Sequence, residues 1–106
     1  MKYKLIITTR AAQDRDGAFA WYGTNYSNEF AARWYEGISH VIESLPHNLA
    51  RGHKALENDR FPFGLYEVLY GKRMNKHRIL YRVEDNAVVI LHIRHSAQRD
   101  LTEDDL

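Results

Sequence analysis

The feature that most constrains the fold is an alternation of side chains in two segments, residues 77–83 and 87–95. Residues 84–86, Glu-Asp-Asn, form a turn signal between them, so the two segments are expected to pair as a β-hairpin. On one face of this hairpin we place six apolar residues: Ile79, Tyr81, Val83, Val89, Leu91 and Ile93. On the other face we place four cationic or titratable residues: Arg78, Arg82, His92 and Arg94.

Burying these basic side chains under helices without partners would be prohibitively costly. We therefore expect the apolar face to pack against helices and the basic face to stay open. An open face with several cations in so small a domain favours an anionic partner.

The remaining segments predict the rest of the fold. Residues 2–8 predict a strand, residues 10–26 a helix capped by Thr9, and residues 28–45 a second, clearly amphipathic helix that Ser27 or Asn28 caps and Pro46 ends. Residues 47–64 form a long irregular segment before a strand at 65–71. This order, β-α-α-β-β-β, predicts an α+β fold in which a two-helix hairpin packs on one face of a small, mainly antiparallel sheet.

The 106 residues suit one domain, which we place at residues 1–99, followed by a short acidic tail at 100–106. Residues 51–99 carry ten Lys/Arg against five Asp/Glu, whereas the tail carries four acids and no base. No apolar run is long enough to span a membrane, and the N-terminus does not match a secretion signal. With no cysteine either, a cytoplasmic location is the simplest expectation.

Three segments together carry a family resemblance: YKLIITTRAAQD near the start, AARWYEGISHVIESLPHN in the middle, and GKRMNKHRILYRVEDNAVVILHIRHSAQRDL near the end. Their order and spacing resemble the RelE/ParE superfamily, the plasmid-stabilisation toxins of bacterial type II toxin–antitoxin systems. The resemblance covers nearly the whole chain. It implies a growth-inhibiting toxin that a cognate antitoxin protein neutralises, and hence a toxin–antitoxin hetero-oligomer.

The resemblance leaves three activities open. RelE-like members cleave mRNA on the ribosome without a metal, and this endoribonuclease activity is our leading expectation. ParE-like members instead poison DNA gyrase without catalysis, and a degenerate member would act only as a protein-binding partner. A shared fold does not decide among these activities.

Metal-free RNA cleavage needs a base, an acid and cations around the phosphate. Arg78 matches an arginine that ribonuclease members keep in the same strand, so we expect it to clamp the phosphate. His92, Arg94 and His95 are the other catalytic candidates, with His92 as a possible proton carrier. Seven further residues are expected to contact nucleic acid: Arg51, Lys54, Lys72, Arg73, Lys76, Arg82 and Arg99.

One feature limits this ribonuclease interpretation: the chain has no tyrosine after Tyr81, although ribonuclease members often carry one near the C-terminus. A zinc site is not expected either. His92 and His95 are separated by two residues on a strand, so their rings should lie on opposite faces, and no cysteine assists them. We therefore expect neither a metal nor a cofactor.

Overall fold

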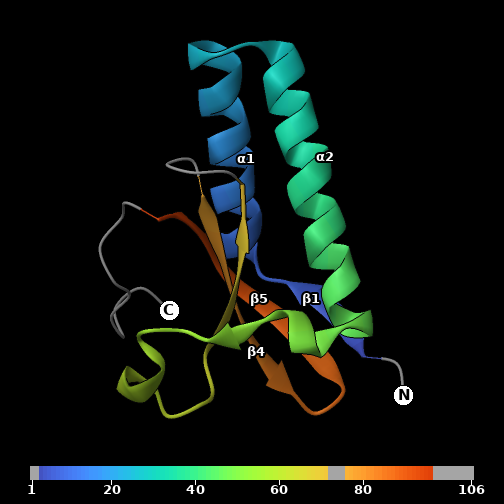
Figure 1. The fold of residues 1–106 in the computed structure, drawn as a ribbon, viewed down its shortest axis with the longest axis vertical. Coiled ribbons are helices and arrows are strands. Elements are labelled where there is room, and N and C mark those ends of the chain that lie inside the picture. The colour runs from blue at the N-terminus through green and yellow to red at the C-terminus, as the bar shows by residue number, and fades with distance from the viewer. Residues whose placement is uncertain (1–2, 72–75, 97–106) are drawn as a thin grey trace.

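The computed structural model describes residues 3–71 and 76–96 and has the expected α+β architecture (Figure 1). Three short 3-10 helices lie in the segment after the second helix. The main elements are β1 (Lys4–Ile7), α1 (Thr9–Asn25), α2 (Asn28–Ser44), β2 (His53–Lys54), β3 (Tyr66–Tyr70), β4 (His77–Glu84) and β5 (Ala87–His95). Within the described residues, no helix is long and apolar enough to cross a membrane.

The strands form one five-stranded sheet with the order β1-β5-β4-β3-β2. Strand β1 pairs in parallel with β5, and the other neighbours are antiparallel. The expected hairpin is confirmed: β4 and β5 join through a two-residue turn in which Asp85 has a φ of 52°. The two-residue strand β2 was not expected from the sequence, because it lies within the irregular segment.

A hydroxyl side chain caps the N-terminus of each helix. The Ser27 hydroxyl accepts a hydrogen bond from the Phe30 N–H at 3.0 Å, as one of the two expected caps of α2. The expected cap of α1 was wrong by one residue, because the Thr8 hydroxyl, not that of Thr9, accepts from Ala11 N–H. Helix α2 ends at Ser44, and Pro46 lies in the short 3-10 turn that follows.

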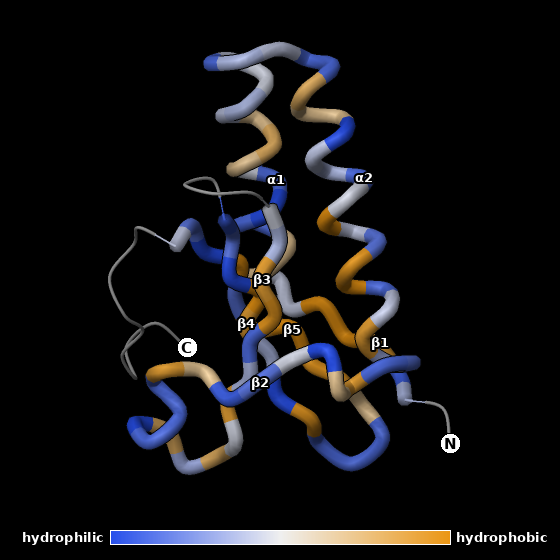
Figure 2. The backbone as a smooth tube through the Cα atoms, in the orientation of Figure 1, coloured by the Kyte–Doolittle hydropathy of each residue, from blue (hydrophilic) through white to orange (hydrophobic). Residues whose placement is uncertain are grey.

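The main core lies between the helix hairpin and the sheet (Figure 2). Helix α2 buries its apolar stripe there, including Trp34, Ile38 and Ile42, whereas α1 has only Ala11 and Tyr22 fully buried. The distal turns of both helices project beyond the strands (Figure 1). Three aromatic side chains are exposed here: Phe19 and Trp21 on α1, and Tyr26 directly after its end.

A β-bulge in β5 changes which residues face the helices. Leu80 is opposite His92, but Tyr81 is opposite Ile90, so Leu91 is the extra residue. Ile79, Tyr81 and Ile93 join the main core as expected, but the expectations for Val83, Val89 and Leu91 were wrong. Val88 and Ile90 take the places of Val89 and Leu91, because the extra residue reverses the alternation of side chains along β5, whereas Val83 is 38% exposed near the end of β4.

The opposite face of the sheet is not open. The irregular segment folds across it and forms a second apolar cluster of Ala55, Phe61, Leu65 and Leu80, with Phe63 and Leu91 at its margin. The segment is anchored by a hydrogen bond from Leu65 N–H to the Asn58 side chain at 2.8 Å. The basic residues expected on an open face therefore meet protein rather than solvent.

Candidate functional site

Arg78 lies on the expected face of β4, but it is buried between two glutamates. Its guanidinium donates to Glu57 at 2.8 and 2.5 Å and to Glu67 at 3.3 and 3.2 Å. Glu57 comes from the irregular segment and is fully buried, and Glu67 comes from the neighbouring strand β3 and is 5% exposed. This carboxylate clasp, Glu57–Arg78–Glu67, ties the irregular segment to the sheet.

The electrostatics of the carboxylate clasp stabilise the charged form of its arginine. The hydrogen bonds that Arg78 donates to Glu57 and Glu67 raise the pKa of Arg78 above its usual value, although burial acts in the opposite direction. The bidentate fork that would clamp a phosphate is thus already engaged by Glu57. The expectation that Arg78 lies exposed on an open groove is wrong, because two acidic side chains cover it.

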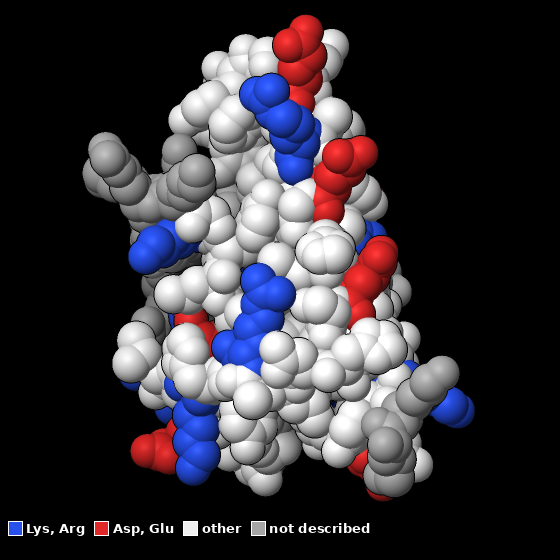
Figure 3. Space-filling model, turned by 45° about the vertical axis from the view of Figure 1, so that its right-hand side comes forward, with Lys and Arg blue, Asp and Glu red and all other residues white. Residues whose placement is uncertain are grey.

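The other expected contacts with nucleic acid are dispersed. Lys54 aligns with Tyr66 at one end of β3, whereas Lys76 precedes His77, which aligns with Tyr70 at the other end. Four residues of strand separate these positions by roughly 13 Å. On the face shown in Figure 3, the basic and acidic side chains of the described residues are interspersed rather than gathered into one basic patch.

Two more of these residues have local partners. Arg82 pairs with Glu84 at 2.7 Å and lies over the Phe63 ring at 5.1 Å. Arg51 is exposed and donates to the Ser44 hydroxyl at 3.2 Å. Lys72, Arg73, Arg99 and the acidic tail lie outside the described residues.

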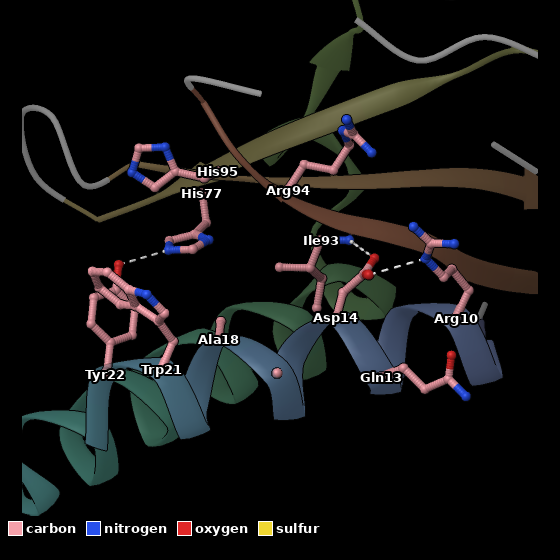
Figure 4. A pocket seen from close by; sticks show the side chains of 11 residues that line it. Arg10, Gln13, Asp14, Ala18, Trp21, Tyr22, His77, Ile93, Arg94 and His95 are labelled. Atoms are coloured by element: carbon pink, nitrogen blue, oxygen red, sulfur yellow. Dashed lines mark hydrogen bonds and ion pairs between the residues drawn. The ribbon is translucent and has the colours of Figure 1, made fainter. Parts of the chain in front are cut away.

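A cavity of about 650 Å³ opens between α1 and the ends of β4 and β5 (Figure 4). Helix α1 contributes Arg10, Asp14 and Trp21 to its wall, and the strands contribute His77, Arg94 and His95. Arg94 is 6% exposed, whereas Trp21 is 54% exposed. We call this space the helix–strand cavity.

Asp14 is the structural centre of one wall of the helix–strand cavity. Its carboxylate accepts from the Ile93 N–H at 3.0 Å and from Arg10 Nε at 3.1 Å, and His92 Nδ1 lies 3.3 Å away. Burial alone would raise the pKa of Asp14, but the contacts with His92, Ile93 and Arg10 outweigh it and lower the pKa. His92, which is 1% exposed, therefore lies against Asp14 of α1 and not on an open face, contrary to expectation.

His77 forms the opposite wall with Tyr22. The Tyr22 hydroxyl lies 2.9 Å from His77 Nε2, and the His77 ring contacts those of Trp34 and His95 at centroid distances of 5.0 and 5.3 Å. Burial, and then the nearby His95, lower the pKa of His77 to about 4. His77 is therefore neutral near pH 7, and its Nε2 can accept a hydrogen bond from Tyr22.

The structure separates the four catalytic candidates. Arg78 and Arg94 are opposite each other on β4 and β5, as the hairpin implies; Arg78 lies in the carboxylate clasp, and Arg94 borders the helix–strand cavity with its side chain pointing away from α1 (Figure 4). His95 also lines this cavity, on the other side of the strand from His92, as expected. In the described ranges, no three His, Asp or Glu side chains converge in a way that could hold a metal ion.

Sequence reasoning missed the residues that organise both places: Glu57, Glu67, Asp14, His77 and Tyr22. The sequence contained a signal for Glu67, because a carboxylate within an apolar strand requires a cation on a neighbouring strand. Glu57 had none, because it lies in an irregular segment whose path depends on tertiary contacts.

Comparisons with known proteins agree with the fold. A family described as the ParE toxin of the type II toxin–antitoxin system, parDE, matches residues 5–100. A chain from a structure described as the chromosomal ParDE toxin–antitoxin system of P. aeruginosa superposes with a TM-score of 0.68 and 19% identity, covering 89% of this chain and 96% of that one. A chain from the RelBE2 toxin–antitoxin complex of Mycobacterium tuberculosis superposes with a TM-score of 0.53 and 22% identity, covering 90% and 99%. No curated protein matches the sequence itself.

Proposed function

Because this chain belongs to the ParE toxin family of type II toxin–antitoxin systems, we propose that it arrests growth in the cytoplasm by binding DNA gyrase and not by cutting RNA. One observation carries the proposal: the carboxylate clasp occupies Arg78, the residue that RNA cleavage would need most. A guanidinium that already holds two carboxylates would have to leave both before it could hold a phosphate. Binding a protein target has no such requirement.

We further propose that an antitoxin protein neutralises the chain. The two similar structures described above are toxin–antitoxin systems, which supports a partner of this kind. Exposed aromatic side chains on α1 and at its C-terminal end, Trp21 and Tyr26 among them, offer apolar contact area of the sort found in protein interfaces.

The test is to induce the chain alone and together with the protein encoded beside it. Growth arrest that co-expression relieves is expected. Purified chain should then inhibit DNA supercoiling by purified gyrase, while the RNA of arrested cells gains no new 5′ ends within translated frames. Unimpaired supercoiling would contradict the gyrase proposal, and absence of arrest would favour a non-toxic binding partner.

Ribosome-linked mRNA cleavage is the second candidate. The helix–strand cavity favours it, because the imidazole rings of His77 and His95 lie together there, with centroids 5.3 Å apart. This activity predicts new 5′ ends in translated frames, with supercoiling unaffected. Arg78→Lys keeps the charge of the clasp and is the suitable variant for testing Arg78, whereas His95→Gln tests the cavity.

A further inference from the structure

We propose that β1 pairs with β1 of a second copy, so that two chains form a symmetric dimer with one continuous sheet. This self-association goes beyond the proposed binding of gyrase and does not depend on it. Strand β1 is the last strand at one edge of the sheet and pairs only with β5, on its inner side. The opposite edge ends in β2, which has two residues and offers less backbone to a partner.

The backbone of β1 directs hydrogen-bonding groups away from the sheet. Lys4 N–H donates to the Asn86 carbonyl at 2.6 Å, and Thr8 N–H donates towards β5 in the same way at 3.1 Å. Because successive residues of a strand direct these groups to opposite edges, the N–H and C=O groups of Leu5 and Ile7 point outward. In the part of the chain that the structure describes, no strand bonds to this outer edge, which is therefore open to strand addition.

The side chains of β1 indicate what kind of strand fits beside it. Leu5 and Ile7, with Tyr3 just before them, are partly buried and pack at the margin of the main core. Ile6 lies on the other face and is 47% exposed, and Lys4 is exposed on that face too. A strand that extends the core must carry apolar side chains at alternate positions, directed to the helices. Strand β1 of a second copy meets this requirement.

One antiparallel register makes the two edges complementary. When Leu5 lies opposite Leu5 of the other copy, Tyr3 lies opposite Ile7, and each pair can exchange two backbone hydrogen bonds. An aromatic side chain opposite a β-branched one is a favourable cross-strand pair. On the other face Lys4 lies opposite Ile6 and not opposite another lysine. The arrangement has two-fold symmetry, and the net charge of +1 adds little repulsion between copies.

Sedimentation velocity of the purified full chain tests this association. The paired edge is short and should bury less than the roughly 800 Å² per partner of a standard interface, so we expect a reversible dimer with a dissociation constant on the order of 10–100 μM. Hydrogen exchange should slow at the Leu5 and Ile7 amides as concentration rises, but not at the Lys4 amide, which already bonds to β5. A chain that stays monomeric up to about 300 μM would overturn the proposal.

A strand from the protein encoded beside the chain is the competing occupant of this edge. It predicts that the purified chain alone stays monomeric and that the Leu5 and Ile7 amides become protected only in the complex of the two proteins. That result would overturn self-pairing.

Charge variants of Ile6 test the register, because this exposed side chain would lie opposite Lys4 of the other copy, and the symmetry creates the pair twice. Ile6→Lys should weaken the dimer about fivefold or more, whereas Ile6→Glu should strengthen it by about the same factor. The double variant Lys4→Glu with Ile6→Lys restores opposite charges and should dimerise at least as well as the unmodified chain.

The matched control is Leu69→Lys, which changes an exposed apolar residue on β3, two strands away from β1. It should leave the dissociation constant unchanged. Circular dichroism confirms that each variant is folded, so a loss of dimer can be assigned to the edge. A dimer that the Ile6 variants leave unchanged, or that Leu69→Lys weakens equally, would refute the pairing through β1.

Discussion

The replacement of Arg78 by methionine should destabilise the protein strongly. In the folded chain this guanidinium makes four hydrogen bonds to Glu57 and Glu67, both of which are almost wholly buried. Arg78→Met leaves two carboxylates together in an apolar environment with their main counter-charge removed. Removing one partner of a buried ion pair typically costs about 3–5 kcal/mol. A domain of this size is stable by only about 5–15 kcal/mol.

The assay is urea denaturation followed by tryptophan fluorescence, which changes as Trp34 leaves the core. Arg82→Met is the matched control on the same strand, because Arg82 pairs with Glu84 near the surface and should contribute at most about 1 kcal/mol. A triple variant, Arg78→Met with Glu57→Leu and Glu67→Leu, should be more stable than Arg78→Met alone, since it also removes the stranded charges. The reasoning is refuted if Arg78→Met lies within about 1 kcal/mol of the unmodified chain.

Three further predictions concern the start of α1 and the walls of the helix–strand cavity. Thr8→Ala should lower the free energy of unfolding by about 1 kcal/mol, because the Thr8 hydroxyl caps α1. The control Thr9→Ala should lower it by under about 0.5 kcal/mol. Equal losses for the two variants in urea denaturation would contradict this prediction. The folded-state pKa of His77, about 4, lies below its usual 6.5, so the unfolded chain binds its proton first as pH falls. The contribution of neutral His77 to the free energy of unfolding is therefore fully present above pH 6.5 and is lost towards pH 4, by up to about 3 kcal/mol. His77→Gln should flatten the dependence of the urea midpoint on pH over this range. Asp14→Ala should cost about 1–3 kcal/mol and accelerate hydrogen exchange at the Ile93 amide, whereas unchanged exchange there would show that the Asp14 contact does not protect it.

The sequence predicts the elements that rest on local patterns. The period of α2 corresponds to its buried face, and the alternation of β4 correctly places Ile79 and Tyr81 in the main core, because neighbouring residues alone determine which side chains share a face. The family resemblance rests on the same segments, and the match over residues 5–100 bears it out. Sequence reasoning therefore reached the toxin family and the helix–sheet packing.

The features that were missed depend on contacts between distant segments. The bulge at Leu91 reverses the faces of β5, and no local signal marks it, since an apolar residue continues the pattern on either face. The burial of Arg78 depends on Glu57, which the irregular segment carries across the sheet. The alternation located the basic face, but it could not show which acidic side chains cover it.

The parallel pairing of β1 with β5 has a consequence for synthesis of the chain. Thr8, at the end of β1, bonds to Ile90, which lies 82 positions later. At roughly 5–20 residues per second, translation takes about 4–16 s to supply that partner, and the helix hairpin meanwhile lacks the central strands that cover its core face. A nascent chain that stops before β5 cannot complete the sheet, so we expect prematurely terminated products to be harmless to the cell and readily degraded. Harm to the host would then begin only once nearly the whole polypeptide has been made.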